Sequence, residues 1–153
     1  MIDQLVSAAC SLLKREPPRL VAATGLIFRE LNKNFDPIEL RNTIESYRGG
    51  IWGEEAAPEV GYQVLRSTNM RGPRVDVRNA AWIALLDDQI EPYILKNGDI
   101  LITKSSGSSD LVGKAALFMH PGDGKTYLFS NFTLRLRPDQ RKVLPDYIAW
   151  FLR

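Results

Sequence analysis

The sequence predicts an α+β (mixed α/β) protein in which N-terminal helices pack on a twisted, mainly antiparallel sheet. Apolar residues recur at helical spacing before Gly50, and after it the pattern changes to short apolar runs separated by turns rich in Gly, Asn and Asp. The chain has 153 residues, of which 44% are hydrophobic and 25% charged. This length and composition suit one globular domain of ordinary size.

Three helices are expected before residue 51. The first two fall within residues 1–35, where Pro17-Pro18 separates two stretches with apolar residues at helical spacing. The third is expected to begin at Asp36, a good N-cap followed by Pro37, and to end at Gly49-Gly50.

The remainder is expected to form short strands and one more helix. Residues 51–59 and the segment that begins at Asp87-Asp88 are expected to be loops, while residues 75–86 fit either a strand or a short helix. Pro145 is a favourable first residue for a final helix. Strands are expected over 62–65, 100–103, 113–119 and, with a break, 127–137.

The run Leu134 to Arg137 alternates apolar and basic side chains. In a strand this alternation places Arg135 and Arg137 on one face of the sheet. Adjacent cations on an exposed face repel one another unless an anion compensates. A DNA phosphate is one candidate for that anion, and acidic residues on a neighbouring strand are the alternative.

A polar loop follows the strand expected at 100–103. Residues 104–109 supply a lysine, hydroxyl groups and a flexible glycine, which are groups that contact phosphates or base edges. A nucleotide-binding P-loop is excluded, because five residues separate Gly107 from Gly113 where that motif has four. In addition, Ala115 follows Lys114 where a Ser or Thr would hold magnesium.

Several segments in the last hundred or so residues, the size of one domain, resemble the target recognition domain of type I restriction-modification specificity subunits. Their order and spacing carry the resemblance. The segments are Gly61 to Gly72, Gly98-Asp99-Ile100-Leu101, Ser105 to Ser109, Gly113 to Leu117, Ser130-Asn131-Phe132 with Leu134 to Arg137, and Leu144-Pro145-Asp146-Tyr147-Ile148.

The resemblance implies sequence-specific binding of double-stranded DNA, with the protein reading one half-site through its loops. Arg and Lys would contact phosphates, while Arg, Asn and Ser would read bases. The candidate DNA-binding residues are Arg66, Ser67, Asn69, Arg71, Arg74, Lys104, Ser105, Ser106, Ser108, Lys114, Arg135 and Arg137. Asn69 has an alternative role, because Asn is favoured in turns whether or not it contacts DNA.

The resemblance also implies an organisation and partners. Residues 1–35, which have no counterpart in the resembled family, are expected to form a helical extension, while 36–143 would be the target recognition domain and 144–153 the start of a truncated spacer helix. A methyltransferase (modification) subunit, and a restriction subunit beside it, would be partners, and a homodimer is a further option. The alternative function is a protein-interaction module that pairs with a methyltransferase subunit or with itself, without reading DNA.

No catalytic, cofactor or metal site is predicted. His120 and Cys10 are the only residues of their types, and no nucleophile elbow or zinc-ligand cluster is present in the sequence. Catalysis is therefore expected in partner chains. One cysteine and no long apolar run indicate a cytoplasmic protein without a membrane span.

Overall fold

The computed structural model describes residues 33, 36, 38–58, 60–107, 109 and 112–153. Contacts within the chain divide it into two units, Met1–Glu39 and Leu40–Arg153, and every helix and strand named below lies in the second. The helices expected within residues 1–35 lie outside the described residues. Over the part of the chain that is described, no helix is long and apolar enough to cross a membrane.

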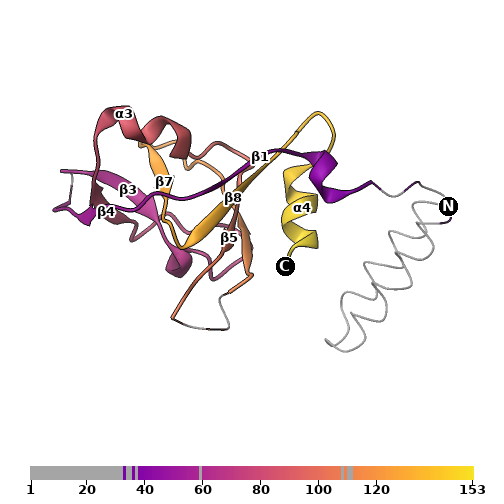
Figure 1. The fold of residues 1–153 in the computed structure, drawn as a ribbon, viewed down its shortest axis with the longest axis horizontal. Coiled ribbons are helices and arrows are strands. Elements are labelled where there is room, and N and C mark those ends of the chain that lie inside the picture. Colours follow the sequence, from indigo (N-terminus) through magenta and orange to yellow (C-terminus); the bar gives the residue numbers. More distant parts are fainter. Residues whose placement is uncertain (1–32, 34–35, 37, 59, 108, 110–111) are drawn as a thin grey trace. The chain divides into compact units, whose positions relative to one another are not determined.

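The second unit contains short strands, short 3-10 helices and two short α-helices (Figure 1). The strands are β1 (Ile44–Gly49), β2 (Glu54–Glu55), β3 (Tyr62–Leu65), β4 (Ala81–Ala84), β5 (Ile100–Thr103), β6 (Ala115–Leu117), β7 (Tyr127–Phe129) and β8 (Thr133–Pro138). The helices are η1 (Leu40–Thr43), η2 (Ser67–Asn69), α3 (Asp87–Ile90), η3 (Glu91–Tyr93) and α4 (Pro145–Phe151).

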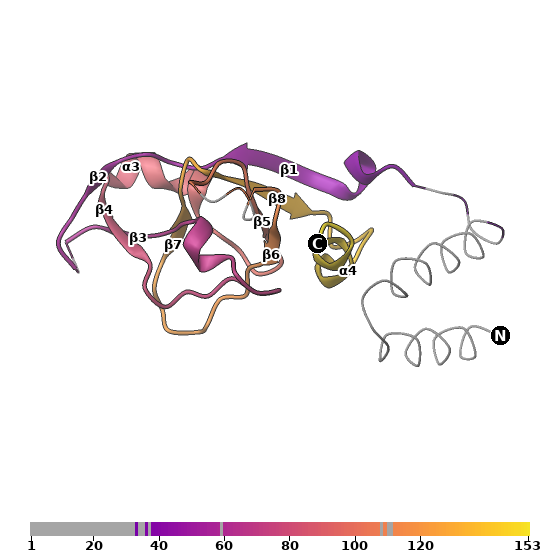
Figure 2. The same ribbon diagram turned by 90° about the horizontal axis from the view of Figure 1, so that it is seen from below.

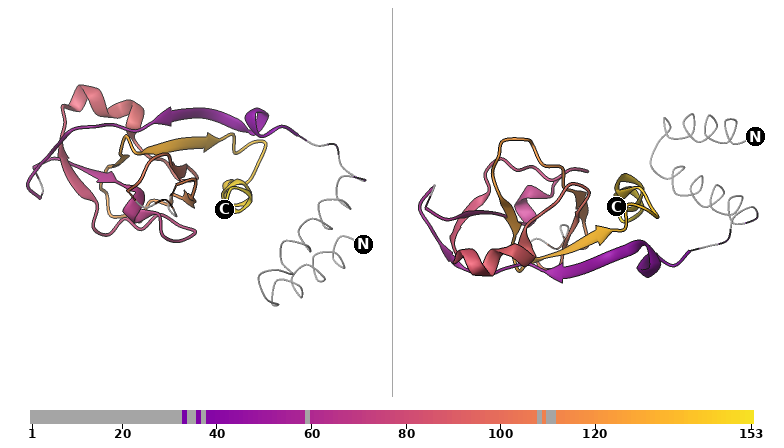
Figure 3. Two further views of the ribbon diagram at one scale, coloured as in Figure 1. Left: turned by 60° about the horizontal axis from the view of Figure 1, so that its bottom comes forward. Right: turned by 90° about the horizontal axis from the view of Figure 1, so that it is seen from above.

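The strands form two four-stranded sheets, one ordered β1-β8-β5-β6 and the other β2-β4-β3-β7. Every pair in the first sheet is antiparallel, and Figure 3 shows β1 and β8 running side by side in opposite directions. In the second sheet, β3 pairs with β7 in parallel and with β4 antiparallel. The α+β class and the mainly antiparallel pairing are thus confirmed, although the strands divide between two sheets.

Apolar clusters cover both faces of strands β3, β5, β6 and β7. The largest lies between the two sheets and includes Leu65 and Phe129 from one sheet and Leu101 from the other. A second cluster joins Ile100 of β5 to Ile148 of α4, and Figure 2 shows α4 beside the β5–β6 edge. A third joins Val64 and Leu128 to Ile90 of α3, with Tyr93 of η3 packed against it.

This layering explains why the strands read as continuous apolar runs. In β5, Ile100 faces α4 while the next residue, Leu101, faces the core between the sheets. In β3, Val64 faces α3 while Leu65 faces the same central core. Because successive side chains in a strand point to opposite faces, both faces need apolar residues when both are covered.

The third expected helix is corrected by the structure. Residues 40–43 form the 3-10 helix η1, and residues 44–49 form strand β1 instead of continuing as a helix to Gly49-Gly50. β1 pairs with β8 from Ile44 opposite Pro138 to Gly49 opposite Leu134. This pairing joins segments about ninety residues apart along the chain, so the local spacing of apolar residues could not reveal it.

Most later expectations agree with the structure. The strands expected at 62–65 and 100–103 are β3 and β5, and the last helix begins at Pro145 as expected. The undecided segment 75–86 contains strand β4. The loop expected at Asp87-Asp88 is instead the first turn of α3, where two carboxylates suit the positive end of a helix.

Candidate functional site

The candidate residues are organised around one end of the two sheets, here called the loop end, where β3, β5 and β7 finish and β6 and β8 begin. Backbone hydrogen bonds join the segments there. The Ser130 amide donates to the Leu65 carbonyl at 2.9 Å, which links β7 to β3. The Lys104 amide donates to the Phe132 carbonyl at 2.8 Å, which links the loop after β5 to the turn before β8.

Three exposed cations at the loop end have no carboxylate partner among the residues that the structure describes: Arg71, Lys104 and Lys114. Lys104 follows β5 directly, and Lys114 precedes β6, where its carbonyl accepts a hydrogen bond from the Thr103 amide. Arg71 follows Met70, whose sulfur accepts a hydrogen bond from the Thr103 hydroxyl. The fold therefore brings three segments that each carry an exposed positive charge, and that are far apart in sequence, to the same end of the sheets.

Two further predicted arginines are exposed but pair with carboxylates. Arg66 follows β3 and lies 3.7 Å from Glu55 of β2. Arg74 lies 3.4 Å from Asp146 of α4. Its backbone pairs with Leu117, at the end of β6 that points away from the loop end. Both pairs are solvent-exposed and hence weak, so an anion could compete for either guanidinium.

The predicted serines lie on two segments of the loop end. Ser105 is exposed and its amide donates to the Phe132 carbonyl at 3.1 Å, while Ser106 is half-buried. Ser67 is half-buried in η2. Ser108, which was also predicted to contact DNA, lies outside the described residues.

Asn69 is buried, and its side-chain amide is engaged within the protein. Its Oδ1 accepts a hydrogen bond from the Arg66 amide at 2.9 Å. Its Nδ2 donates to the carbonyls of Asp76, at 2.8 Å, and Arg78, at 3.1 Å. These bonds close the loop after β3, which is the turn-building role that the sequence left open beside base contact.

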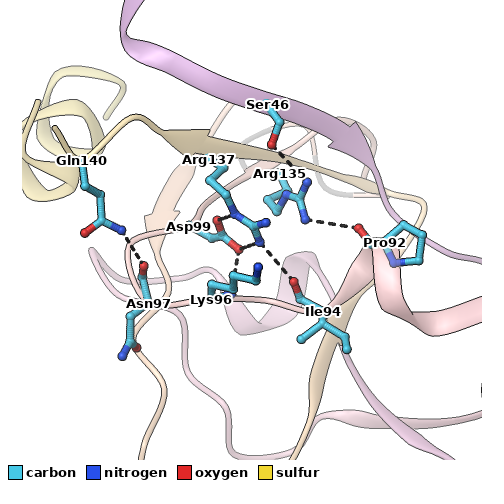
Figure 4. A network of polar contacts seen from close by, with 9 residues as sticks. All are labelled: Ser46, Pro92, Ile94, Lys96, Asn97, Asp99, Arg135, Arg137 and Gln140. Atoms are coloured by element: carbon cyan, nitrogen blue, oxygen red, sulfur yellow. Dashed lines mark hydrogen bonds and ion pairs between the residues drawn. The ribbon is translucent and has the colours of Figure 1, made fainter. Parts of the chain in front are cut away.

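Arg137 is half-buried and does not lie on an exposed sheet face. Its guanidinium donates two hydrogen bonds of 2.7 Å to the fully buried carboxylate of Asp99 (Figure 4). A third donor reaches the Ile94 carbonyl at 3.2 Å. The hydrogen bonds to Asp99 raise the pKa of Arg137 above its ordinary value. The ion pair joins β8 to the start of β5. The Asp99 carboxylate, and not a DNA phosphate, therefore neutralises Arg137.

Arg135 is buried, because it lies opposite Leu101 on the side of β8 that faces the central core. Its guanidinium donates to the Pro92 carbonyl at 3.2 Å and lies 5.7 Å from the centre of the Phe129 ring. Burial lowers the pKa of Arg135 from its ordinary value. The face that carries Arg135 and Arg137 is thus covered and not exposed, and the anion that compensates Arg137 is an acidic residue beside a neighbouring strand, which is the alternative that the sequence left open. Arg137 forms an ion pair with Asp99, and Arg135 is buried in the protein.

The turn between β7 and β8 belongs to the loop end, although the sequence analysis did not select its residues as site candidates. Asn131 and Phe132 occupy this turn, and the Phe132 side chain is 50% exposed. The signal was present, since Ser130-Asn131-Phe132 is one of the segments that carry the resemblance. An apolar side chain in a turn carries no local signal of contact with DNA, in contrast to a basic or hydroxyl side chain.

In the described part of the chain, no cluster of three or more His, Cys, Asp or Glu residues could hold a metal ion. The His120 ring is engaged locally. Its Nδ1 accepts a hydrogen bond from the Gly122 amide at 2.9 Å, and its Nε2 lies 2.8 Å from the Lys125 carbonyl. This ring closes the turn between β6 and β7.

Comparison with known proteins shows homologues among restriction enzyme subunits. The chain is 26% identical over 125 residues to the putative type I restriction enzyme MjaX specificity subunit of Methanocaldococcus jannaschii, covering 81% of this chain and 29% of the relative. It is also 26% identical over 125 residues to the type I restriction enzyme EcoKI specificity subunit of Escherichia coli K12, covering 82% and 25%. The StySPI specificity subunit of Salmonella potsdam is 27% identical over 103 residues, covering 67% and 20%.

The chain thus spans less than a third of the length of the curated relatives it matches. No family model matches it. Among solved structures, the crystal structure of the HsdS subunit from Thermoanaerobacter tengcongensis aligns with a TM-score of 0.42 and 13% identity, covering 98% of this chain and 39% of that one.

Proposed function

We propose that this chain, whose homologues are type I restriction enzyme specificity subunits, is a target recognition domain that binds one half-site of double-stranded DNA in a sequence-specific manner. The observation that carries the proposal is the gathering of Arg71, Lys104 and Lys114 at the loop end, in a chain homologous to specificity subunits. These cations contact backbone phosphates, and the hydroxyl groups beside them contact base edges.

The proposal assigns different weight to the candidate residues. The primary contacts come from Arg71, Lys104, Lys114 and Ser105, which are exposed. Arg66 and Arg74 join them by leaving weak surface ion pairs. Asn69, Arg135 and Arg137 act indirectly, because their hydrogen bonds hold the loops and strands that carry the contacts.

The proposal also includes an organisation and partners. Residues 36–143 are the recognition domain, 1–35 an N-terminal extension, and 144–153 a segment of the spacer helix. A methyltransferase subunit, with a restriction subunit beside it, carries out the chemistry at the DNA to which this chain directs it. This chain itself contributes binding and no catalytic step.

A salt series on duplex DNA tests the contact surface. Fluorescence anisotropy would measure the affinity of the full chain for a random-sequence duplex pool at several salt concentrations. Each phosphate contact contributes about 0.9 to the slope of log affinity against log salt concentration. We therefore expect Arg71→Ala, Lys104→Ala and Lys114→Ala each to weaken binding and to reduce that slope by about 1.

Lys125→Ala is the matched control, because Lys125 is an exposed lysine in the turn between β6 and β7, at the other end of β6 from Lys114. Its slope and affinity should equal those of the unmodified chain. If the chain fails to bind DNA even at low salt, or if Lys125→Ala and Lys104→Ala behave alike, the proposed surface is wrong.

The second candidate function is the interaction module, and one observation favours it. On α4, Tyr147 and Trp150 are 48% and 52% exposed, and Leu144 just before the helix is 73% exposed. Such an apolar surface suits a partner protein, with a methyltransferase subunit as the expected occupant. Salt separates the two functions, since an apolar interface is much less sensitive to salt than phosphate binding.

A further inference from the structure

Phe132 is a large, exposed apolar residue that lies among polar segments. It occupies the turn between β7 and β8, and half of its surface is exposed. Its own carbonyl accepts hydrogen bonds from the amides of Lys104 and Ser105, at 2.8 and 3.1 Å. Two backbone hydrogen bonds therefore join Phe132 to the loop that carries Lys104, one of the proposed phosphate contacts.

The backbone beneath Phe132 is fixed from several sides. The Thr133 amide donates to the Ser130 carbonyl at 2.9 Å, which closes the turn itself. The Asn131 amide donates to the Ile51 carbonyl at 2.9 Å, and the Gly50 amide donates to the Thr133 carbonyl at 3.2 Å. A residue held by this many backbone bonds is presented in one position, which suits a contact that must be made at a defined place.

The Phe132 ring has no aromatic stacking partner among the described residues, in contrast to Phe118 and Phe129, whose rings pack against other aromatic rings. Leaving such a side chain half in water forgoes part of the free energy that burial of its apolar surface would provide. An uncharged ring has nothing to offer a phosphate. In the major groove, the apolar feature of a base edge is the 5-methyl group of thymine.

We propose that Phe132 is a specificity-determining residue whose ring contacts a thymine methyl group in the major groove of the bound half-site. This inference rests on the proposed DNA-binding function. Lys104, whose amide is bonded to the Phe132 carbonyl, holds a neighbouring phosphate and so sets the distance between ring and groove. The contact adds selectivity for thymine at one position without adding a charge.

The test uses duplexes enriched by the full chain from a randomised pool. Each thymine in the enriched half-site is replaced, one at a time, by uracil, which lacks only the methyl group. For the unmodified chain we expect one such replacement to weaken binding about fourfold, the value for one buried methyl-sized group. Phe132→Ala should bind both duplexes equally, and its salt slope should match that of the unmodified chain.

Two further variants complete the experiment. Phe132→Leu keeps an apolar side chain and should retain part of the preference for thymine over uracil. Leu86→Ala removes an exposed apolar side chain beside α3, next to the strand end opposite the loop end, and should leave the preference intact. Thermal unfolding of each variant shows whether its turn still folds.

The outcomes separate this inference from the proposed function. If no sequence is enriched, the DNA-reading function itself fails. If a sequence is enriched but contains no thymine, or if Phe132→Ala keeps the same thymine-to-uracil ratio as the unmodified chain, the role of Phe132 is wrong while DNA reading stands. A fall in the salt slope of Phe132→Ala would also contradict it, because it would indicate a lost phosphate contact.

Discussion

At the scale of single residues, the ion pair between Asp99 and Arg137 connects the first sheet to the turn that precedes it. The Asp99 carboxylate is fully buried, and besides Arg137 it accepts a hydrogen bond from the Lys96 amide at 2.8 Å. It therefore closes the turn at Asn97-Gly98, where Gly98 has a φ of 90°. One carboxylate thus fixes both a turn and a strand.

We expect Asp99→Asn to destabilise the protein by about 3–5 kcal/mol, because it leaves the partly buried Arg137 guanidinium without a compensating charge. The free energy of unfolding in urea would measure this loss. Asp76→Asn is the matched control, since Asp76 also pairs with an arginine, Arg78, but on the exposed surface. Equal effects of the two substitutions would contradict the structural role assigned to Asp99.

Single residues also show where sequence reasoning was limited. Alternation along β8 correctly placed Arg135 and Arg137 on one face. It could not say which face is covered, because that depends on a second sheet and on Asp99, which is 38 residues from Arg137 along the chain. Asn69 shows the same limit, since its hydrogen bonds to the carbonyls of Asp76 and Arg78 cannot be seen in local composition.

At the scale of secondary structure, the segment after β1 passes very close to the β7–β8 turn. A Cβ added to Gly50 would lie 2.1 Å from the carbonyl oxygen of Ser130. Only glycine fits this close approach without movement of the backbone. The same turn carries Phe132. The close packing of Gly50 against this turn therefore helps to hold it in position at the loop end.

We predict that Gly50→Ala destabilises the protein by about 1–3 kcal/mol or more, because about 1–3 kcal/mol is the usual cost of forcing extra atoms into a packed site. Denaturant unfolding would measure it. Gly107→Ala should have little effect, because a Cβ at Gly107 meets no atom of the described residues within 4 Å. If Gly50→Ala unfolds at the same denaturant concentration as the unmodified chain, the close packing at this turn is not required.

The elements differ in how well the sequence predicted them. β3, β5 and α4 were predicted because their signals are local: apolar runs bounded by turns, and Pro145 at a helix start. β1 was missed because its partner is β8, far along the chain. The Asp36-Pro37 cap and the spacing after it favoured a helix, and pairing between distant strands outweighed that local preference.

At the scale of the whole domain, function depends on bringing separate loops together. The segments after β3 and β5, before β6 and between β7 and β8 come from four parts of the chain, and the two sheets bring their ends to the same place. The sequence predicted most of these loops as polar and basic. It did not predict the division into two sheets, because sheet order depends on contacts between distant strands.

The organisation of the domain leads to one expectation about binding. Cations at the loop end supply affinity, while the side chains held between them supply selectivity. A domain built in this way should bind many sequences weakly and a few sequences more tightly. Nonspecific binding alone would give the same salt dependence but no preferred sequence.

The most direct measurement is selection from a pool of randomised duplex DNA with the full chain at two salt concentrations, followed by sequencing of the bound fraction. A short fixed motif should be enriched at both salt concentrations and should be lost in Lys104→Ala or Arg71→Ala. If the bound fraction is as random as the starting pool, and those substitutions change nothing, the chain does not read DNA by itself and the central claim is contradicted.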